Sequence, residues 1–108
     1  MGKIKATNEN FKRIVLDATG PVLVDFGATW CGPCRMMETI MRTMSDKHNI
    51  VTVDVDSCQE VTAPYNISAV PTFVVFKDGK EVARTTGIQK QETLEALLSK
   101  GRETPYKI

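Results

Sequence analysis

The sequence predicts an α/β domain in which parallel strands alternate with helices before an antiparallel hairpin closes the sheet. Three observations carry this prediction. An apolar run over residues 22–26, which only Asp25 interrupts, is typical of a buried parallel strand. Apolar side chains then recur with helical spacing from about residue 31 to 47. Further on, Asp78-Gly79 lies between two strand-like segments and is a strong hairpin signal.

The first half of the chain contains a strand, a helix, a strand and a second helix. We expect a short strand over residues 3–6, and then a helix with Thr7 or Asn8 as its N-cap and Phe11, Ile14, Val15 and Ala18 on its apolar face. Gly20-Pro21 ends this helix, and the buried strand follows. The helix expected over 31–47 has an apolar stripe that predicts packing against the sheet, with an adaptable binding surface as the alternative. The stripe consists of Met37, Ile40, Met41 and Met44.

The second half contains a strand, a short helix, a hairpin and a last helix. A third strand is expected over 50–55, followed by a helix that Ser57-x-x-Glu60 opens as a capping box and that ends before Asn66. Proline cannot donate to a strand ladder, so the next strand, 72–76, begins after Pro71. Its hairpin partner is expected over 81–86 and the last helix over 91–98, and residues 101–108 are expected to be an exposed C-terminal tail.

The composition is that of one soluble globular domain over residues 1–108. The chain is 42% hydrophobic and 25% charged, which is enough to build a core without cross-links. Its formal net charge is +1 and it has no long charge run, so nucleic acid and membrane surfaces are not expected partners. No apolar stretch approaches the roughly 18 residues that a membrane helix needs. We expect a monomer.

The N-terminus and the cysteine count bear on the cellular compartment. The first six residues lack the apolar segment of a secretory signal. Gly2 does not begin a myristoylation motif, because the hydroxyl residue is Thr7 and does not stand at position 6. Three cysteines make a poor disulfide scaffold, which fits a reducing compartment. We therefore expect a cytoplasmic protein, with a removed transit peptide as the alternative.

Cys31 and Cys34 form a Cys-x-x-Cys pair at the junction of a strand and a helix, which indicates a redox motif. Helical residues three apart have Cβ atoms about 5–6 Å apart, so the pair can form a disulfide with little rearrangement. The helix N-terminus should lower the pKa of the first thiol. Cys31 is therefore the expected exposed nucleophile, and Cys34 is the expected buried resolving thiol. Gly32 leaves room for a substrate backbone, and Pro33 suits a first helical turn.

Trp-Cys-Gly-Pro-Cys at 30–34, preceded by Val-Asp-Phe and followed by Val70-Pro71-Thr72, resembles a cytosolic-type thioredoxin. The resemblance covers about residues 3–99. It implies a thioredoxin fold, with a central mixed five-stranded sheet flanked by four helices, and a single thioredoxin domain. Many relatives have a helix-kinking proline where this chain has Thr39, so a kink in the second helix is left open.

Asp25 interrupts the apolar strand. From the residues alone it is either a structural, hydrogen-bonded Asp or a buried carboxylate whose raised pKa lets it accept a proton near neutral pH. The resemblance implies the second role, with Asp25 accepting the proton of Cys34 through water. Relatives often place a Lys nearby on the third strand where this chain has Thr52. We therefore expect burial, more than a charged partner, to set the pKa of Asp25.

The resemblance also implies a substrate-binding rim around the cysteine pair. Pro71 would be a cis-proline beside the disulfide, and the Val70 backbone would pair with an extended substrate segment. Trp30 would be an exposed platform, although a core aromatic is the alternative from the residues alone. The rim would consist of Trp30, Ala69, Val70, Gly87 and Ile88. Gly27 replaces a larger residue of many relatives, so a more open site is expected.

Three further residues have chemistry worth locating. Cys58 follows the expected Ser57 cap, so a lowered pKa and a regulatory role are possible alternatives to an ordinary reduced thiol. Arg35 keeps a positive charge beside the cysteine pair in planar form. His48 is expected to be a solvated cation at the end of the long helix.

The function expected from these features is protein-disulfide reduction, which makes the chain a thiol-disulfide oxidoreductase. Cys31 attacks a client disulfide, Cys34 resolves the mixed disulfide, and the resulting Cys31–Cys34 disulfide is reduced from outside. No cofactor-binding motif is present. The resemblance implies electrons from NADPH through a flavin-dependent thioredoxin reductase, and a role in cell redox homeostasis. It implies peroxiredoxins, methionine sulfoxide reductases and ribonucleotide reductase as examples of clients.

Three other functions are open at this point. An oxidant or isomerase would use the same chemistry in another direction, although Gly-Pro between the cysteines resembles the reducing members and isomerases typically have Gly-His. A binding module would use the apolar rim without turnover. A zinc site would need four Cys or His ligands, and only Cys58 and His48 remain to join the pair, so no metal is expected.

Overall fold

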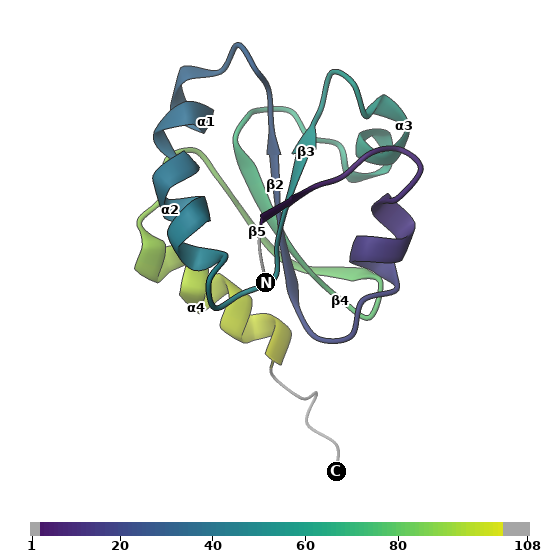
Figure 1. Cartoon of the computed structure of the whole chain (residues 1–108), viewed down its shortest axis with the longest axis vertical. Helices are drawn as coiled ribbons and strands as arrows, with labels where there is room; N and C mark the ends of the chain where they lie inside the picture. The colour runs from purple at the N-terminus through teal and green to yellow at the C-terminus, as the bar shows by residue number, and fades with distance from the viewer. Residues whose placement is uncertain (1–2, 103–108) are drawn as a thin grey trace.

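The computed structural model describes residues 3–102, which form a five-stranded sheet with helices on both faces (Figure 1). The strand order is β1-β3-β2-β4-β5. Three strands run parallel to one another: β1 (Lys3–Lys5), β2 (Val22–Gly27) and β3 (Ile50–Asp54). The others, β4 (Thr72–Lys77) and β5 (Lys80–Thr86), form an antiparallel hairpin beside β2. The predicted mixed sheet and its closing hairpin are therefore confirmed.

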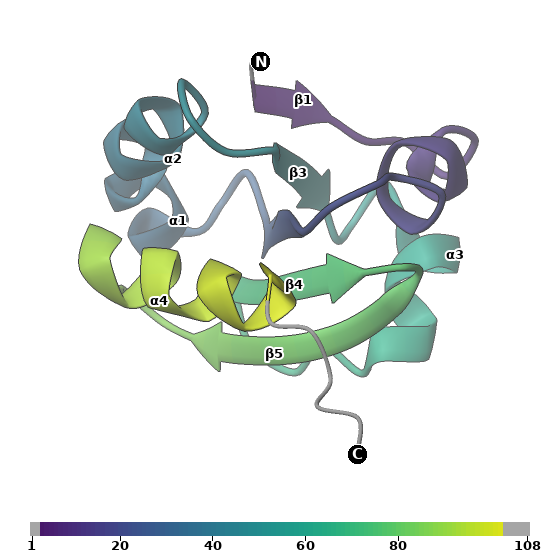
Figure 2. The same ribbon diagram turned by 90° about the horizontal axis from the view of Figure 1, so that it is seen from below.

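Two helical layers enclose the sheet (Figure 2). On one face lie the π-helix η1 (Lys12–Leu16) and α3 (Gln59–Thr62), which the 3-10 turn η2 (Ala63–Tyr65) extends. On the other face lie α1 (Gly32–Met36), α2 (Glu38–Met44) and α4 (Gln91–Arg102). None of the helices formed by residues 3–102 has the length and apolar character needed to cross a membrane.

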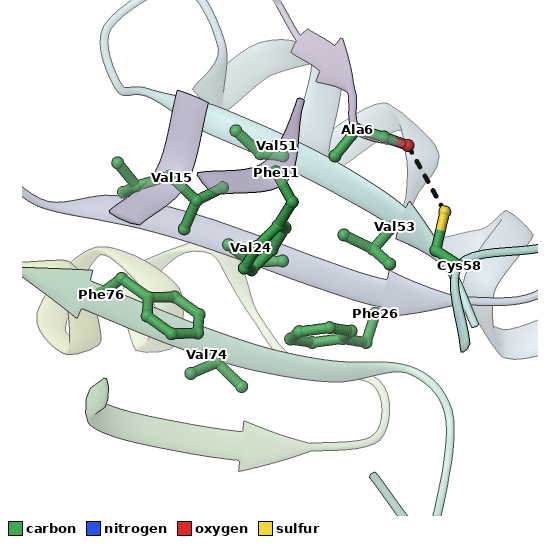
Figure 3. Packing of buried hydrophobic residues seen from close by; sticks show 11 residues of the cluster. Ala6, Phe11, Val15, Val24, Phe26, Val51, Val53, Cys58, Val74 and Phe76 are labelled. Atoms are coloured by element: carbon green, nitrogen blue, oxygen red, sulfur yellow. Dashed lines mark hydrogen bonds between the residues drawn. The ribbon is translucent and has the colours of Figure 1, made fainter. Parts of the chain in front are cut away.

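The sheet divides the core into two clusters, which explains why β2 has apolar residues on both of its faces. Leu23 faces α2 and α4, whereas Val22, Val24 and Phe26 face η1 and α3. Successive side chains of a strand point to opposite faces, so a strand covered on both sides is apolar at nearly every position, and Asp25 is the exception in β2. The η1 side is aromatic and valine-rich (Figure 3). The α2 side contains the buried methionines Met37, Met41 and Met44, so their predicted packing role is confirmed.

Thr7 caps the turn that leads into the first helix, but η1 itself begins at Lys12 and is not a regular α-helix. The Thr7 hydroxyl accepts a hydrogen bond from the Asn10 amide (3.1 Å), and the Asn10 side chain accepts one from the Thr7 amide (2.7 Å). Asn8 is not the cap, since its side chain accepts a hydrogen bond from the Val61 amide instead. The Asp17 amide then donates to the Lys12 carbonyl, a spacing of five that widens the turn.

The helix predicted over 31–47 is broken at Met37 and ends earlier. The Met37 amide is shared between the carbonyls of Pro33 and Cys34, each at 3.2 Å, and α2 begins at the next residue. The interruption thus forms without a proline, and the buried Met37 side chain packs in the core cluster on this side of the sheet. Beyond Met44 the Met44 carbonyl accepts hydrogen bonds from both Lys47 and His48, which tightens the end into a turn.

Two boundaries in the second half of the chain differ from the prediction. The Ser57 capping box does not form, because Cys58 is the N-cap of α3 and no side chain caps that helix. The cause is a turn after β3, in which the Asp54 carbonyl accepts a hydrogen bond from the Cys58 amide. The last helix runs to Arg102, so Gly101 is a buried helical residue and is not part of a tail. The rest of the predicted tail, 103–108, lies outside the described residues.

Candidate active site

The cysteine pair lies where the central strand β2 ends and α1 begins. Cys31 is the N-cap of α1, and Cys31 and Cys34 form a disulfide with their Cα atoms 5.2 Å apart. The Cys34 amide donates to the Cys31 sulfur at 3.1 Å. This amide is one of the donors that a helix start leaves free, so it can stabilise negative charge on the sulfur. Pro33 stands in the first turn, where a missing amide hydrogen costs no helical hydrogen bond.

The exposure of the two cysteines is the reverse of the prediction. Cys31 is only 3% exposed, whereas Cys34 is half-buried. The Val70 carbonyl oxygen lies 3.7 Å from the Cys31 sulfur, so the loop before β4 covers that side of the disulfide. Cys34 instead borders a cavity of about 200 Å³ that lies beside Gly27 and Asp25. The expectation of an exposed Cys31 and a buried Cys34 is therefore wrong for the disulfide form.

Asp25 is a buried carboxylate on β2, at the wall of the same cavity. Burial raises its pKa from 3.8 to about 6, while the positive charge of Lys3 opposes this shift and Glu38 adds to it. Thr52 is its neighbour in register on β3, so that strand supplies no cation there. The predicted dominance of burial in the pKa of Asp25 is confirmed. One Asp25 oxygen, Oδ1, has no hydrogen-bond partner among residues 3–102.

Sequence reasoning missed the charged groups around Asp25. Lys3 and Lys5 of β1 line the cavity, as do Glu38 at the start of α2 and Asp54 at the end of β3. Lys3 and Lys5 are two residues apart and therefore share one face of the edge strand, so their spacing could have predicted a positively charged strip there. No pattern in the sequence places Glu38 near Asp25, because the direction of its side chain depends on the break between α1 and α2 at Met37.

Among the residues predicted to form a rim, Val70 lies on the covered side of the disulfide. Trp30 is 66% exposed, and its indole nitrogen donates to the Asp56 carboxylate at 2.8 Å, so it is not a core aromatic. The Val70–Pro71 peptide bond is cis, as predicted. The Gly87 amide donates to the Pro71 carbonyl at 2.8 Å, which joins the two rim segments. Ala69 and Ile88 are exposed.

Gly87 also has a conformational reason to be glycine. Its φ is +90°, in the region that side chains with a Cβ rarely adopt. One exposed apolar residue, Met36 of α1, was not predicted to belong to this surface.

Cys58 lies away from the cysteine pair, in the core between the sheet and α3. It is buried, and its sulfur donates to the Ala6 carbonyl at 3.6 Å (Figure 3). Arg35 points toward the loop before α1, where its guanidinium donates to the Thr29 carbonyl at 3.0 Å. Within residues 3–102, no three side chains of the types His, Cys, Asp and Glu converge in a way that could hold a metal ion.

His48 is not the solvated cation that was predicted. Its side chain is largely buried between α2 and α4, with Nε2 3.3 Å from the Glu95 carboxylate. Arg102 lies 3.0 Å from Nδ1 on the other side of the ring. An arginine can only donate, so Nδ1 accepts and Nε2 carries the proton that faces Glu95. The turn that the Met44 carbonyl closes after α2 directs the His48 ring toward α4.

Comparison with known proteins adds to this geometry. The thioredoxin family model matches residues 2–100. Thioredoxin C-2 of Corynebacterium nephridii is 40% identical over 99 residues, which cover 88% of this chain and 92% of that protein. The thioredoxin of Bacillus subtilis (strain 168) is 39% identical over 104 residues, covering 93% and 98%. A point-mutant thioredoxin from Halobacterium salinarum NRC-1 superposes with a TM-score of 0.84 at 30% identity, covering 96% of this chain and 95% of that one.

Proposed function

The chain belongs to the thioredoxin family and is a thiol-disulfide oxidoreductase, and from this premise we propose that it reduces disulfides of client proteins through a mixed disulfide at Cys31. The observation that carries the proposal is the disulfide at the start of α1, with the Cys34 amide on the Cys31 sulfur. When the disulfide opens, the Cys31 thiolate can keep the hydrogen bond that the Cys34 amide donates. We expect the thiol pKa of Cys31 to lie below that of free cysteine for this reason.

The reaction requires two exchanges. The Cys31 thiolate attacks one sulfur of the client disulfide, forms a new S–S bond and releases the other client sulfur as a thiolate, which takes up a proton. Cys34 then loses its proton, attacks the Cys31 sulfur and releases the second client thiol. The client gains two electrons and two protons, and the chain ends as the Cys31–Cys34 disulfide. Trp30, Ala69, Val70, cis-Pro71, Gly87 and Ile88 are proposed to bind the client segment, with backbone pairing at Val70.

Asp25 is proposed to accept the proton of Cys34 in the second exchange. With a pKa of about 6, Asp25 is mostly ionised at neutral pH and is able to take a proton. The rate of client release should therefore fall as the pH drops through about 6. Stopped-flow measurement of client release at several pH values tests this, and Asp25→Asn should remove the step near pH 6. A step that persists in that variant contradicts the role of Asp25.

The electrons must come from another protein. We propose that a flavin-dependent thioredoxin reductase supplies them from NADPH, and that the chain works in the cytoplasm in redox homeostasis. Membership of the family supports a reductase and disulfide-containing clients as partners in general. Peroxiredoxins, methionine sulfoxide reductases and ribonucleotide reductase are the client classes that we propose to test first.

Insulin reduction coupled to thioredoxin reductase and NADPH is the direct test. Cys31→Ser should lose at least about a hundredfold in rate, because the attacking nucleophile is removed. Cys34→Ser should instead accumulate a mixed disulfide between Cys31 and the client, visible by mass spectrometry. Equal rates for the wild type and Cys31→Ser would end the proposal.

A further inference from the structure

The segment 66–71 joins η2 to β4 and includes three of the residues proposed to bind clients, Ala69, Val70 and cis-Pro71. Its four middle residues, 67–70, lie outside the helices and strands, and they donate none of the backbone-to-backbone hydrogen bonds formed among residues 3–102. The course of the segment therefore depends on side-chain packing and on the contacts at its two ends.

The carboxyl end of the segment is held by residues of the β4–β5 hairpin and the loop that follows it. The Gly87 amide donates to the Pro71 carbonyl at 2.8 Å. The Thr72 hydroxyl donates to the Ala69 carbonyl at 2.7 Å. A hydroxyl has a single hydrogen, so the Thr86 hydroxyl, 3.3 Å from that of Thr72, is the donor between those two.

The amino end of the segment is held by an arginine of β5. Arg84 donates from Nη2 to the carbonyl of Tyr65 at 2.8 Å, and Tyr65 is the last residue of η2. The next residue, Asn66, has a φ of +52°, a conformation that asparagine tolerates better than most residues. The chain thus changes direction immediately after the carbonyl that Arg84 fixes.

Glu81 holds the Arg84 side chain in place. Its carboxylate accepts hydrogen bonds from Nε and Nη2 of Arg84, and the second is 2.7 Å long. The hydrogen bond from Arg84 lowers the pKa of Glu81, so the carboxylate stays charged at neutral pH. Two parallel hydrogen bonds fix the plane of a guanidinium, which leaves the other hydrogen of Nη2 directed at the Tyr65 carbonyl.

A β-bulge brings Glu81 and Arg84 to the same face of β5. Arg84 pairs with Val74 and Glu81 pairs with Phe76, and the register on β4 passes over Val82. Residues three apart in a regular strand point to opposite faces, and the extra residue of the bulge cancels this difference. Val74 and Phe76 belong to the core cluster on the η1 side, so the ion pair lies on the side of the sheet that η2 covers.

The position of the segment matters for the reaction at Cys31. The Val70 carbonyl lies 3.7 Å from the Cys31 sulfur, and the backbone of the same residue is proposed to pair with the client. A misplacement of about 1 Å in a reacting complex can cost on the order of a hundredfold in rate. Contacts that fix the ends of the segment can therefore affect catalysis without touching the client.

We propose that Arg84, held by Glu81, is a positioning residue for client binding, because it fixes the Tyr65 carbonyl from which the client-binding segment starts. The proposal rests on the proposed function, since it concerns the segment that binds the client there. Arg84 acts through the backbone of 66–71, and it has no part in the exchange at the two sulfurs.

Insulin reduction at varied insulin concentration, with thioredoxin reductase and NADPH in excess, tests this role. Arg84→Ala should raise the KM for insulin about fivefold to tenfold and leave kcat within about twofold of the wild type, because client binding is weakened and the sulfurs are unchanged. A variant that is only partly folded has a lower apparent kcat at the same KM, so a purely structural effect has a different signature.

Lys80→Ala is the matched control. Lys80 is an exposed cation at the start of the same strand, so its removal changes the net charge equally. Its KM and kcat should both equal those of the wild type. Arg84→Lys should recover only part of the lost affinity, since an ammonium group is a point charge and cannot replace the planar fork. If Arg84→Ala does not fold, Arg84→Lys provides the same test of KM.

A double-mutant cycle shows whether Glu81 acts through Arg84. Glu81→Ala should raise the KM less than Arg84→Ala does, and the double variant should have the KM of Arg84→Ala, because residues that act as a unit are not additive. Additive increases in KM would overturn the role of Glu81.

The failures of the two proposals are distinguishable. An unchanged KM in Arg84→Ala, or a fall in kcat alone, would overturn the positioning role of Arg84. Failure of the wild type to reduce insulin would contradict the proposed function instead.

Discussion

The two ends of the central strand β2 differ in polarity and in packing. At its carboxyl end lie a buried carboxylate, a cavity and an exposed tryptophan, contributed by Asp25, Gly27 and Trp30. At its amino end, which we call the closed end, Pro21 packs against the last turn of α4. The same strand thus holds an unfavourable polar group at one end and a tightly packed contact at the other. The difference indicates that stability is concentrated away from the reactive end.

The closed end is formed by segments far apart in the sequence. Gly101 of α4 lies under Pro21 and Val75, and His48 connects the end of α2 to Glu95 and Arg102 of α4. These contacts hold α4 against the hairpin strands β4 and β5 and the amino end of β2.

Asp25→Asn should stabilise the protein at neutral pH. Burial raises the pKa of Asp25 from 3.8 to about 6, so above pH 6 the folded state keeps a charge that the unfolded chain accommodates more easily. A shift of this size corresponds to roughly 3 kcal/mol of lost stability. The loss is absent below pH 3.8 and is complete above about pH 6. Urea unfolding should therefore show the variant roughly 3 kcal/mol more stable at pH 7.5, with the difference shrinking toward pH 4.

The matched control for this prediction is the pH dependence itself. A gain that is equal at pH 4 and pH 7.5 would come from packing or hydrogen bonding of the amide and not from the removed charge. That outcome would break the contrast between the ends, because the carboxyl end would then carry no electrostatic penalty.

Gly101→Ala should destabilise the closed end. The new Cβ would lie 2.8 Å from Pro21 Cβ and 3.0 Å from Val75 Cγ1, so the α4 contact must shift. Overpacking costs roughly 1–3 kcal/mol, and the better helix propensity of alanine offsets up to about 1 kcal/mol of it. We expect a net loss of roughly 1–2 kcal/mol in urea unfolding.

Gly32→Ala is the same change at the reactive end. Nothing lies within 4 Å of a Cβ there, so its stability should be unchanged or raised by up to about 1 kcal/mol. Equal losses in the two alanine variants would show that the ends do not differ in packing.

Much of the fold follows from local patterns. The buried run of β2, the methionine stripe and the Asp78-Gly79 turn each predict one structural feature without help from distant residues. The boundaries that differ, at Met37, Ser57 and Gly101, depend on tertiary contacts. The carbonyl of Asp54, the last residue of β3, accepts a hydrogen bond from the Cys58 amide, so that Ser57 is not the cap. Pro21 and Val75 pack against Gly101 in α4. Propensity alone does not contain this information.

The candidate site divides in the same way. Spacing predicts that Cys31 and Cys34 can bond, and an acid within an apolar strand predicts the raised pKa of Asp25. Which sulfur is exposed could not be predicted from the pair itself. It depends on the Val70 loop on one side and on the missing side chain of Gly27 on the other.

The smallest loss of stability that we expect from removing a contact concerns His48 at the closed end. His48→Ala removes a ring that bridges Glu95 and Arg102, at 3.3 and 3.0 Å. Hydrogen bonds of this kind contribute about 0.5–1.5 kcal/mol each, and both partners reach water once the ring is gone, so we expect a loss of about 1 kcal/mol. The neighbouring Lys47 is exposed, so Lys47→Ala should stay within about 0.5 kcal/mol of the wild type. Urea unfolding of both variants decides whether the bridge stabilises this end: equal values would leave the Gly101 contact as its source, and a larger loss in His48→Ala would assign part of the stability to the ring.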